Sequence, residues 1–250
     1  MEKKVKINNA CYDDFGKRWY EEGNDHPIAL LRAENRARLP WINRIIEEHF
    51  GTSPLKILDV GCGGGLVCNE LIKKGHAVTG VDLSLPSLEI AKERDSTKRV
   101  NYLEANALEL PFENSTFDIV CSMDFLEHVE DPERAVKESS RVLKPNGLFF
   151  FHTFNRNFLS YLVIIKGVEW FVRKTPKNLH LYNLFIKPSE LKEMGAKNGL
   201  YPGSLQGLSP KCSLPLLKML LTRRVPPNLE FQFTSSSPCG YSGFFIKNIK

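Results

Sequence analysis

The chain has 250 residues, of which 42% are hydrophobic and 25% are charged. These fractions are typical of a folded globular protein and exclude a disordered or collagen-like chain. The net charge of +5 is too small to indicate a nucleic-acid partner, although it is compatible with weak attraction to an anionic surface.

Cysteine usage and hydropathy place limits on compartment and membrane topology. The six cysteines form no CxxC pair, so neither a zinc site nor a redox centre is indicated. The N-terminal residues include no apolar stretch typical of a secretory signal. The most apolar run, 158–172, is interrupted by Lys166 and Glu169 and is shorter than the roughly 20 residues needed to cross a bilayer. We therefore expect a reduced, cytoplasmic protein.

Short apolar segments alternate with amphipathic segments in the middle of the chain. Strands are expected at 55–60, 77–82, 100–104, 117–123 and 147–154. Helices are expected at 66–74, 85–94 and 132–143. The last of these helices begins at Pro132, which suits a first helical position, and Asp131 is placed to cap it. Strands alternating with helices of this length predict βαβ units and a parallel, doubly wound sheet within an α/β fold.

We expect residues 1–250 to form one domain whose core is residues 55–154. Three further segments lie outside this core. Residues 1–50 are expected to form a helical cap, with a long helix at 28–50. Residues 155–187 form a helical insert after the fifth strand. Residues 188–250 should contain a helix beginning near Pro188 and edge strands at 231–234 and 240–249.

The strongest motif is Ile57-Leu-Asp-Val-Gly-Cys-Gly-Gly-Gly65, a buried strand that runs into glycines and then into a helix. Glycines such as Gly61 and Gly63 allow the backbone to turn sharply and to approach a ligand closely. Dinucleotide-binding enzymes use the same device, but Leu66 occupies the position of the third glycine of GxGxxG. The acidic Asp59 before the loop suits a ligand with ammonium and sulfonium groups better than a pyrophosphate.

Polar and thioether side chains follow the next strands at the positions where an adenosine moiety would lie. Asp82 ends the second strand, where an acid accepts hydrogen bonds from both ribose hydroxyls. Asn106 follows the third strand, where it could read an adenine edge, and Met123 ends the fourth strand. Each residue alone has an ordinary structural explanation. Their order at successive strand ends indicates an adenosine-containing cofactor.

In these motifs the chain resembles the class I S-adenosylmethionine-dependent methyltransferases, which have a Rossmann-like fold, across roughly residues 36–154. Further segments within residues 15–191 resemble the O-methyltransferases of ubiquinone biosynthesis, which methylate polyprenyl catechols and phenols. These segments are Trp19-Tyr-Glu-Glu-Gly23, Asn35-Arg-Ala-Arg-Leu39, Leu58-Asp-Val-Gly-Cys-Gly-Gly-Gly65, Val78-Thr-Gly-Val-Asp82, Leu126-Glu-His-Val129, Asn155-Arg-Asn157 and Phe185-Ile-Lys-Pro-Ser-Glu-Leu191. The resemblance implies that Arg38, Gly61, Asp82 and Met123 contact S-adenosylmethionine, with Arg38 at its carboxylate.

The chain departs from this family at two places. It has Pro176-Lys-Asn-Leu-His180 where the family has Pro-Lys-Gly-Thr-His, and Thr234-Ser-Ser-Ser-Pro238 replaces a terminal strand similar to Val-Asn-Tyr-Met. Both departures lie in the part that selects the acceptor. His180 is either a substrate contact or a structural residue.

Three polar residues after the fourth strand are candidates for the chemistry. Asp124, Glu127 and His128 are spaced i, i+3 and i+4, so a helical turn would place them on one face. A phenol, with a pKa near 10, is a poor nucleophile until a base or a metal removes its proton. Glu127 and His128 could act as the base, or all three residues could hold a Mg²⁺-type ion, as the resemblance implies. Alternatively, Glu-His is a local structural signature and the histidine caps the loop.

The insert combines aromatic and basic side chains. It contains Phe158, Tyr161, Trp170 and Phe171, and five basic residues but only one acid lie between positions 166 and 187. This composition is typical of a helix that meets an anionic lipid surface, although a helix packed on the sheet with a solvated basic face would look the same. The segment 214–224 could add a second patch of this kind.

The sequence therefore predicts an S-adenosylmethionine-dependent O-methyltransferase that acts on a phenolic or catecholic hydroxyl of a lipid-soluble, polyprenylated quinone precursor. Peripheral contact with the inner face of a membrane is expected. A C- or N-methyltransferase of another metabolite, a nicotinamide oxidoreductase and a non-catalytic protein that binds S-adenosylmethionine are the alternatives. The missing third glycine and the position of Asn106 argue against the oxidoreductase. A protein that only binds the cofactor would not need Asp124, Glu127 and His128.

Overall fold

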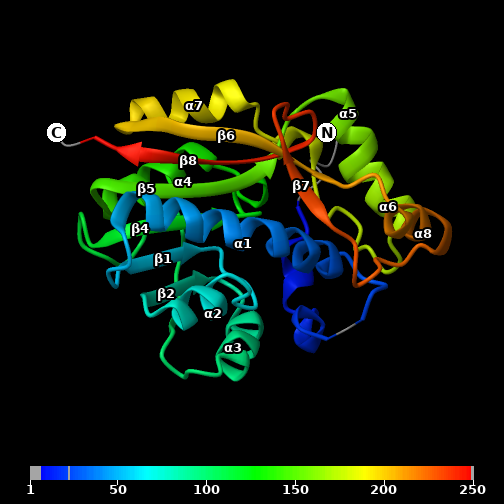
Figure 1. Cartoon of the computed structure of the whole chain (residues 1–250), viewed down its shortest axis with the longest axis horizontal. Helices are drawn as coiled ribbons and strands as arrows, with labels where there is room; N and C mark the ends of the chain where they lie inside the picture. The colour runs from blue at the N-terminus through cyan, green and yellow to red at the C-terminus, as the bar shows by residue number, and fades with distance from the viewer. Residues whose placement is uncertain (1–6, 22, 249–250) are drawn as a thin grey trace, which may run out of the picture.

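A computed structural model describes residues 7–21 and 23–248 of the chain (Figure 1). Its centre is one eight-stranded sheet in the order β3-β2-β1-β4-β5-β8-β6-β7. The first five strands in this order are parallel to one another, and the last three pair antiparallel. The strands are β1 (Lys56–Val60), β2 (Ala77–Asp82), β3 (Asn101–Glu104), β4 (Phe117–Met123), β5 (Leu143–Phe154), β6 (Leu200–Pro210), β7 (Phe231–Thr234) and β8 (Gly240–Lys247).

Helices cover both faces of the sheet because neighbouring strand residues point to opposite sides. On one face, Ile57, Ile119 and Phe150 pack in a core with α1 (Ile28–Phe50), α2 (Cys68–Leu71) and α3 (Leu85–Arg94). On the other face, Leu58, Val120 and Phe149 pack in a second core with α4 (Pro132–Val142) and α7 (Pro188–Lys197). The prediction of a Rossmann-like, doubly wound and mostly parallel sheet is confirmed.

Local signals explain why α3 and α4 begin where the sequence predicts, whereas the helix predicted at 66–74 is α2 followed by a 3₁₀ turn at Ile72–Lys74. The hydroxyl of Ser84 accepts a hydrogen bond from the backbone N–H of Ser87 at the start of α3. Asp131 accepts one from the N–H of Arg134 at the start of α4, with Pro132 in the first turn. The fifth strand begins at Leu143 rather than at the predicted residue 147, and Asn146 within it has a φ of +62°.

The C-terminal part of the sheet differs from the prediction. The segment expected as an edge strand at 240–249 is β8, which lies between β5 and β6, while β7 does lie at the edge. Ile249 is outside the described residues. β6 was not predicted, because Pro202, Gly203 and Gly207 give this segment a low intrinsic preference for strand. Its backbone pairs with β8 on one side and β7 on the other.

Several short segments gather at the end of the sheet where the parallel strands terminate (Figure 1). The N-terminal 3₁₀ turns span Asn9–Tyr12 and Gly16–Trp19. The insert after β5 consists of α5 (Phe158–Ser160), a π-helical segment (Tyr161–Gly167) and α6 (Val168–Phe171). Helix α8 (Leu214–Thr222) lies between β6 and β7 and packs against α6. In the described part of the chain, no helix is long and apolar enough to span a bilayer.

Candidate active site

The glycine loop leaves β1 in a conformation that requires glycine. Gly61 and Gly63 have φ angles of +72° and +49°, in the left-handed region that favours glycine. A Cβ atom at Gly63 would lie 2.5 Å from the ring of Trp19, so the indole packs directly on the loop. The N–H of Gly61 donates to the carbonyl oxygen of Val81 over 2.8 Å. These contacts tie the loop to β2 and to the N-terminal segment.

Asp82 lies at the carboxyl end of β2 and binds the glycine loop through backbone hydrogen bonds. Its Oδ2 accepts a hydrogen bond from the N–H of Gly63 at 2.8 Å, and its Oδ1 accepts one from the N–H of Ser84 at 2.9 Å. Burial raises the pKa of this carboxyl group above its usual value. The carboxylate is thus held in one orientation between the loop and α3, where the sequence places the ribose-binding acid.

The other residues predicted at the cofactor occupy the same edge of the sheet. Asp59 is buried beneath the loop, where it accepts a hydrogen bond from the thiol of Cys68 at 3.2 Å. Burial raises the pKa of Asp59 to about 7. The side chain of Asn106 is exposed, and its Oδ1 accepts a hydrogen bond from the N–H of Leu108. Met123 is buried at the end of β4.

Arg38 is completely buried on α1 and makes polar contacts with three side chains. Its Nε donates to Asn35, its Nη1 lies 2.6 Å from Oδ2 of Asp124, and its Nη2 lies 3.5 Å from Oε2 of Glu34. Within the described residues, Nη2 has no hydrogen-bond partner. A buried guanidinium with an unused donor suits a carboxylate ligand, which is the role implied for Arg38.

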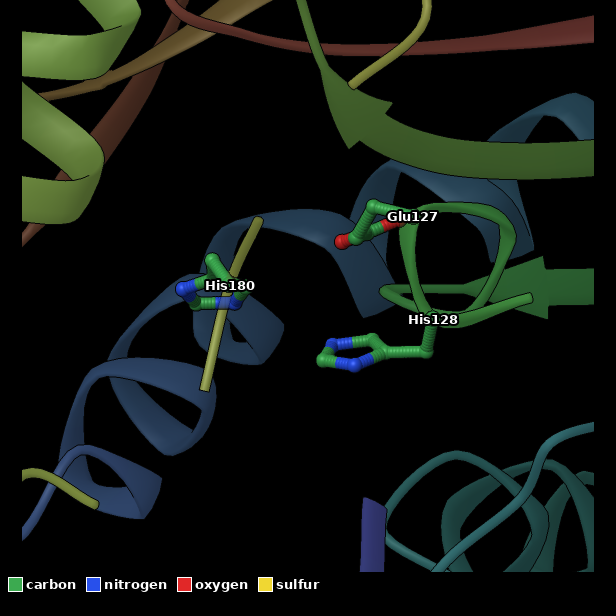
Figure 2. A group of neighbouring side chains, drawn as sticks. All are labelled: Glu127, His128 and His180. Carbon is green, nitrogen blue, oxygen red and sulfur yellow. The ribbon is translucent and has the colours of Figure 1, made fainter. Parts of the chain in front are cut away.

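Glu127, His128 and His180 form a cluster beside the carboxyl end of β4. Figure 2 shows Glu127 and His128 projecting from the turn after β4 toward His180, which comes from the segment before α7. One ligating atom from each residue lies within 4.8 Å of the others. The rings of His128 and His180 have centroids 5.3 Å apart. The cluster therefore joins two segments that are far apart in the sequence.

Burial controls the protonation of this cluster. Oε2 of Glu127 accepts a hydrogen bond from the hydroxyl of Thr153 at 2.8 Å, and burial raises the pKa of Glu127 to about 8. Burial lowers the pKa of His128 well below its usual value and that of His180 to about 4, so both imidazoles are neutral near pH 7. Nε2 of His128 lies 3.1 Å from the hydroxyl of Tyr12. Oε1 of Glu127 and Nδ1 of His128 have no hydrogen-bond partner within residues 7–21 and 23–248.

The predicted grouping of Asp124 with Glu127 and His128 needs correction. The backbone of Asp124 has a φ of +55°, and only Leu126–His128 form a 3₁₀ turn, so the three side chains do not share a helical face. Asp124 instead pairs with Arg38 and lies 3.6 Å from Nε2 of His152. Its potential metal-ligand group is the one with Glu34 and His152. His180 takes the place that the sequence assigns to Asp124.

A cavity of about 400 Å³ opens onto this cluster. Five polar residues lie at one end of it: Tyr12, Glu34, Asp124, His128 and His180. Apolar side chains from α1, the insert, α8 and β7 line the remainder. An apolar cavity with a few polar groups at one end is the usual form of a small-molecule site.

Tyr12 and Thr153 are site residues that the sequence does not predict, and no sequence pattern links His180 with Glu127 or His128. Tyr12 precedes the first long helix, and no local pattern connects it with His128. Thr153 occupies a strand position that usually holds an ordinary core residue. The only available signal was the position of His180 after the Pro-Lys dipeptide that the family shares.

Comparisons with known proteins agree with this geometry. The methyltransferase domain family matches residues 58–151. The ubiquinone biosynthesis O-methyltransferase of Bordetella avium (strain 197N) is 37% identical over 210 residues, covering 82% of this chain and 85% of the relative. That of Coxiella burnetii (strain RSA 331 / Henzerling II) is 38% identical over 194 residues, covering 76% and 80%.

Among solved structures, an S-adenosylmethionine-dependent methyltransferase from Thermotoga maritima has the same fold, with a TM-score of 0.63 at 19% sequence identity. The similarity covers 96% of this chain and 99% of that chain. Fold, cofactor motifs and sequence relatives thus lead to one assignment. The chain belongs to the ubiquinone biosynthesis O-methyltransferases, a family of S-adenosylmethionine-dependent enzymes.

Proposed function

We propose that the protein transfers a methyl group from S-adenosylmethionine to a phenolic or catecholic hydroxyl of a polyprenylated ubiquinone precursor. The observation that carries this proposal is the position of the Glu127–His128–His180 cluster beside an otherwise apolar cavity. The cavity suits an apolar aromatic acceptor, and the cluster supplies groups that can take up a proton. The names of the relatives point to the same class of acceptor.

The residues at the strand ends fit the cofactor. Asp82 offers a carboxylate that is held rigidly for the ribose hydroxyls, and Nη2 of Arg38 is a buried donor for the cofactor carboxylate that makes no hydrogen bond within the described residues. The glycine loop allows the protein backbone to approach the cofactor closely. When bound, S-adenosylmethionine supplies the electrophilic methyl group, and the protein must position the acceptor and remove its hydroxyl proton.

Proton removal falls to the cluster. His128 is held neutral by burial, and an unprotonated imidazole can accept a proton from a phenol. Glu127 can do so in its ionised form, since its pKa is raised toward the range in which a general base is most effective. We assign the role of base to these two residues. Tyr12 and Thr153 orient them through the contacts described above.

The cluster also fits a divalent ion, but with a donor set different from the predicted one. One carboxylate and two neutral imidazoles come from Glu127, His128 and His180. Mg²⁺ prefers oxygen ligands, whereas imidazole suits first-row transition metals. These donors thus favour an ion such as Zn²⁺ or Fe²⁺ over Mg²⁺. Such an ion would act as a Lewis acid that lowers the pKa of the acceptor hydroxyl.

Peripheral membrane contact is the second part of the proposal. Exposed apolar side chains gather on the insert and on α8, including Phe158 (72% exposed) and Leu214 (82%). Arg173, Lys218 and Arg224 line one open groove beside them, and none of the three forms an ion pair with another described residue. Apolar side chains next to unpaired cations are typical of a surface that meets anionic lipid.

The acceptor class can be tested with purified protein. We expect methyl transfer from S-adenosylmethionine to the hydroxyl oxygen of a prenylated catechol, with the O-methyl product identified by mass spectrometry. In a strain lacking the protein, the unmethylated precursor should accumulate in the lipid extract. Methylation of carbon or nitrogen, or an unchanged lipid profile, would contradict the proposal.

Membrane contact can be tested by flotation with vesicles. The wild type should float with anionic vesicles at low salt and less at high salt, because salt screens the electrostatic part of binding. The double variant Phe158→Glu/Leu214→Glu should stay in solution. Tyr201→Glu is the matched control, since Tyr201 is an exposed aromatic residue on β6, outside the insert and α8, and its variant should still float. Failure of the wild type to float under every condition would refute the membrane contact.

A further inference from the structure

We infer that the cavity is the binding site of the acceptor's polyisoprenoid tail and that α8 and the insert are the two walls that recognise it. This inference rests on the proposed function, because it concerns the same acceptor. It goes beyond that function by assigning tail recognition to particular side chains. Three features of the structure support it: the distribution of the cavity lining, the two faces of α8 and the position of the cavity opening.

The lining changes character along the cavity. The polar side chains lie at the end next to the cluster, where the aromatic head must sit for its hydroxyl to reach His128. Away from this end, the walls are aliphatic and aromatic side chains that pack in one cluster: Leu30 from α1, Val168 from the insert, Leu216 and Met219 from α8, and Phe231 from β7. A catechol ring bound at the polar end would not contact these apolar side chains. A branched, apolar chain attached to the ring matches them.

Helix α8 has two apolar faces that differ in their surroundings. Leu216, Met219 and Leu220 line the cavity at helical spacing i, i+3 and i+4. Met219 is only 9% exposed and packs with Val172 of the insert, whereas Leu217 on the other face is 52% exposed. The inner face thus forms a wall of the cavity. Met219 suits this position because its flexible thioether adapts to an irregular apolar ligand.

The cavity reaches the surface between the insert and α8. Leu162, Trp170 and Leu220 line it and are also exposed to solvent, so this end is open. The opening lies beside the exposed apolar side chains of the same two segments. A tail that is too long for about 400 Å³ can therefore leave the protein here and stay in a lipid phase. The head reaches the cluster while the distal tail remains outside.

The first test is a series of catechols with no, one, two or three isoprene units, assayed in detergent without lipid. An isoprene unit has about the apolar size of a leucine side chain, so each unit that enters the cavity should raise kcat/KM by about tenfold. The gain should stop once the cavity is filled. Equal kcat/KM for all members of the series would overturn the inference, while methylation of the head would leave the proposed function intact.

The second test uses variants on the two faces of α8. Leu220→Glu places a charge at the opening and Met219→Trp fills the cavity, so each should reduce the gain from the tail by about tenfold or more. The gain is the ratio of kcat/KM for the two-isoprene catechol to that for the catechol without a tail. Leu217→Glu is the matched control on the outer face and should keep the wild-type ratio. An equal loss of this ratio in the control, or no loss in either inner-face variant, would refute the assignment.

The two proposals fail in different ways. If no catechol is methylated, with or without a tail, the proposed function is wrong. If catechols are methylated with the same kcat/KM whether or not they carry a tail, only the assignment of the tail-binding site is wrong. The wild-type series decides this even if a variant does not fold.

Discussion

Replacing Glu127 with glutamine or His128 with alanine is expected to lower kcat by about 100-fold or more, the usual scale for the loss of a general base. Glu127→Gln keeps the volume of the side chain and an oxygen that can accept the hydrogen bond from Thr153. It removes the carboxylate that could take up the proton. His128→Ala removes the buried neutral imidazole. Both should leave the Kd of S-adenosylmethionine nearly unchanged, which calorimetry can measure.

His76→Ala is the matched control for the loss of a buried imidazole. Nδ1 of His76 accepts a hydrogen bond from the N–H of Leu55 before β1, at the amino end of the strand and away from the cluster. This variant should lose stability but keep kcat.

If a metal contributes, a chelator should reproduce the loss seen in the variants, and Zn²⁺ or Fe²⁺ should restore activity better than Mg²⁺. Full activity of both variants would rule out the cluster as the catalytic site.

Replacing Asp82 with alanine is expected to weaken the binding of S-adenosylmethionine by about tenfold or more. Two ribose hydrogen bonds to a carboxylate are charge-assisted and contribute roughly 1.5–3 kcal/mol each. The substitution also frees the N–H groups of Gly63 and Ser84, which loosens the glycine loop. Asp82→Asn, which keeps one carbonyl oxygen, should lie between the alanine variant and the wild type. Calorimetric titration gives all three affinities.

Asp95 provides a control for the structural part of this effect. Its carboxylate accepts backbone hydrogen bonds from Thr97, Arg99 and Val100 in the turn between α3 and β3. Asp95→Ala therefore removes a comparable set of backbone contacts away from the glycine loop. It should lower the melting temperature without changing the affinity for the cofactor. Unchanged affinity in Asp82→Ala, or tight binding of NADH by the wild type, would contradict the cofactor site.

The sequence predicts the parallel half of the sheet well because its determinants are local. The bounds of α1, β2, α3 and β4 agree with the prediction. Helix α1 lies between Pro27 and Gly51 and Ser84 caps α3, while β2 and β4 are short apolar runs. The residues at the cofactor site can also be predicted from local sequence, because parallel strands all end at one edge of the sheet and their last residues lie together there. Asp82 is one example. Its hydrogen bond to Gly63 links two motifs that the sequence identifies separately.

Long-range contacts explain what the sequence did not predict. β6 is a strand because β8 and β7 pair with it, although its own residues favour a turn. Asp124 leaves its expected group because Arg38, 86 positions earlier, neutralises it. His180 joins Glu127 and His128 only after the insert has folded over the sheet. None of these contacts leaves a periodic signal in the chain.

The connection between β6 and β7 has a topological consequence. Pro210 and Phe231 are register partners on adjacent antiparallel strands, so the segment 211–230, which carries α8, leaves and rejoins the sheet at neighbouring points. Loops with closely spaced ends tolerate changes in length at little cost in closure entropy. The segment 211–230 can therefore be exchanged between relatives without moving a strand or the glycine loop. Chimaeras made at Pro210 and Phe231 would graft a new acceptor preference onto an unaltered cofactor half.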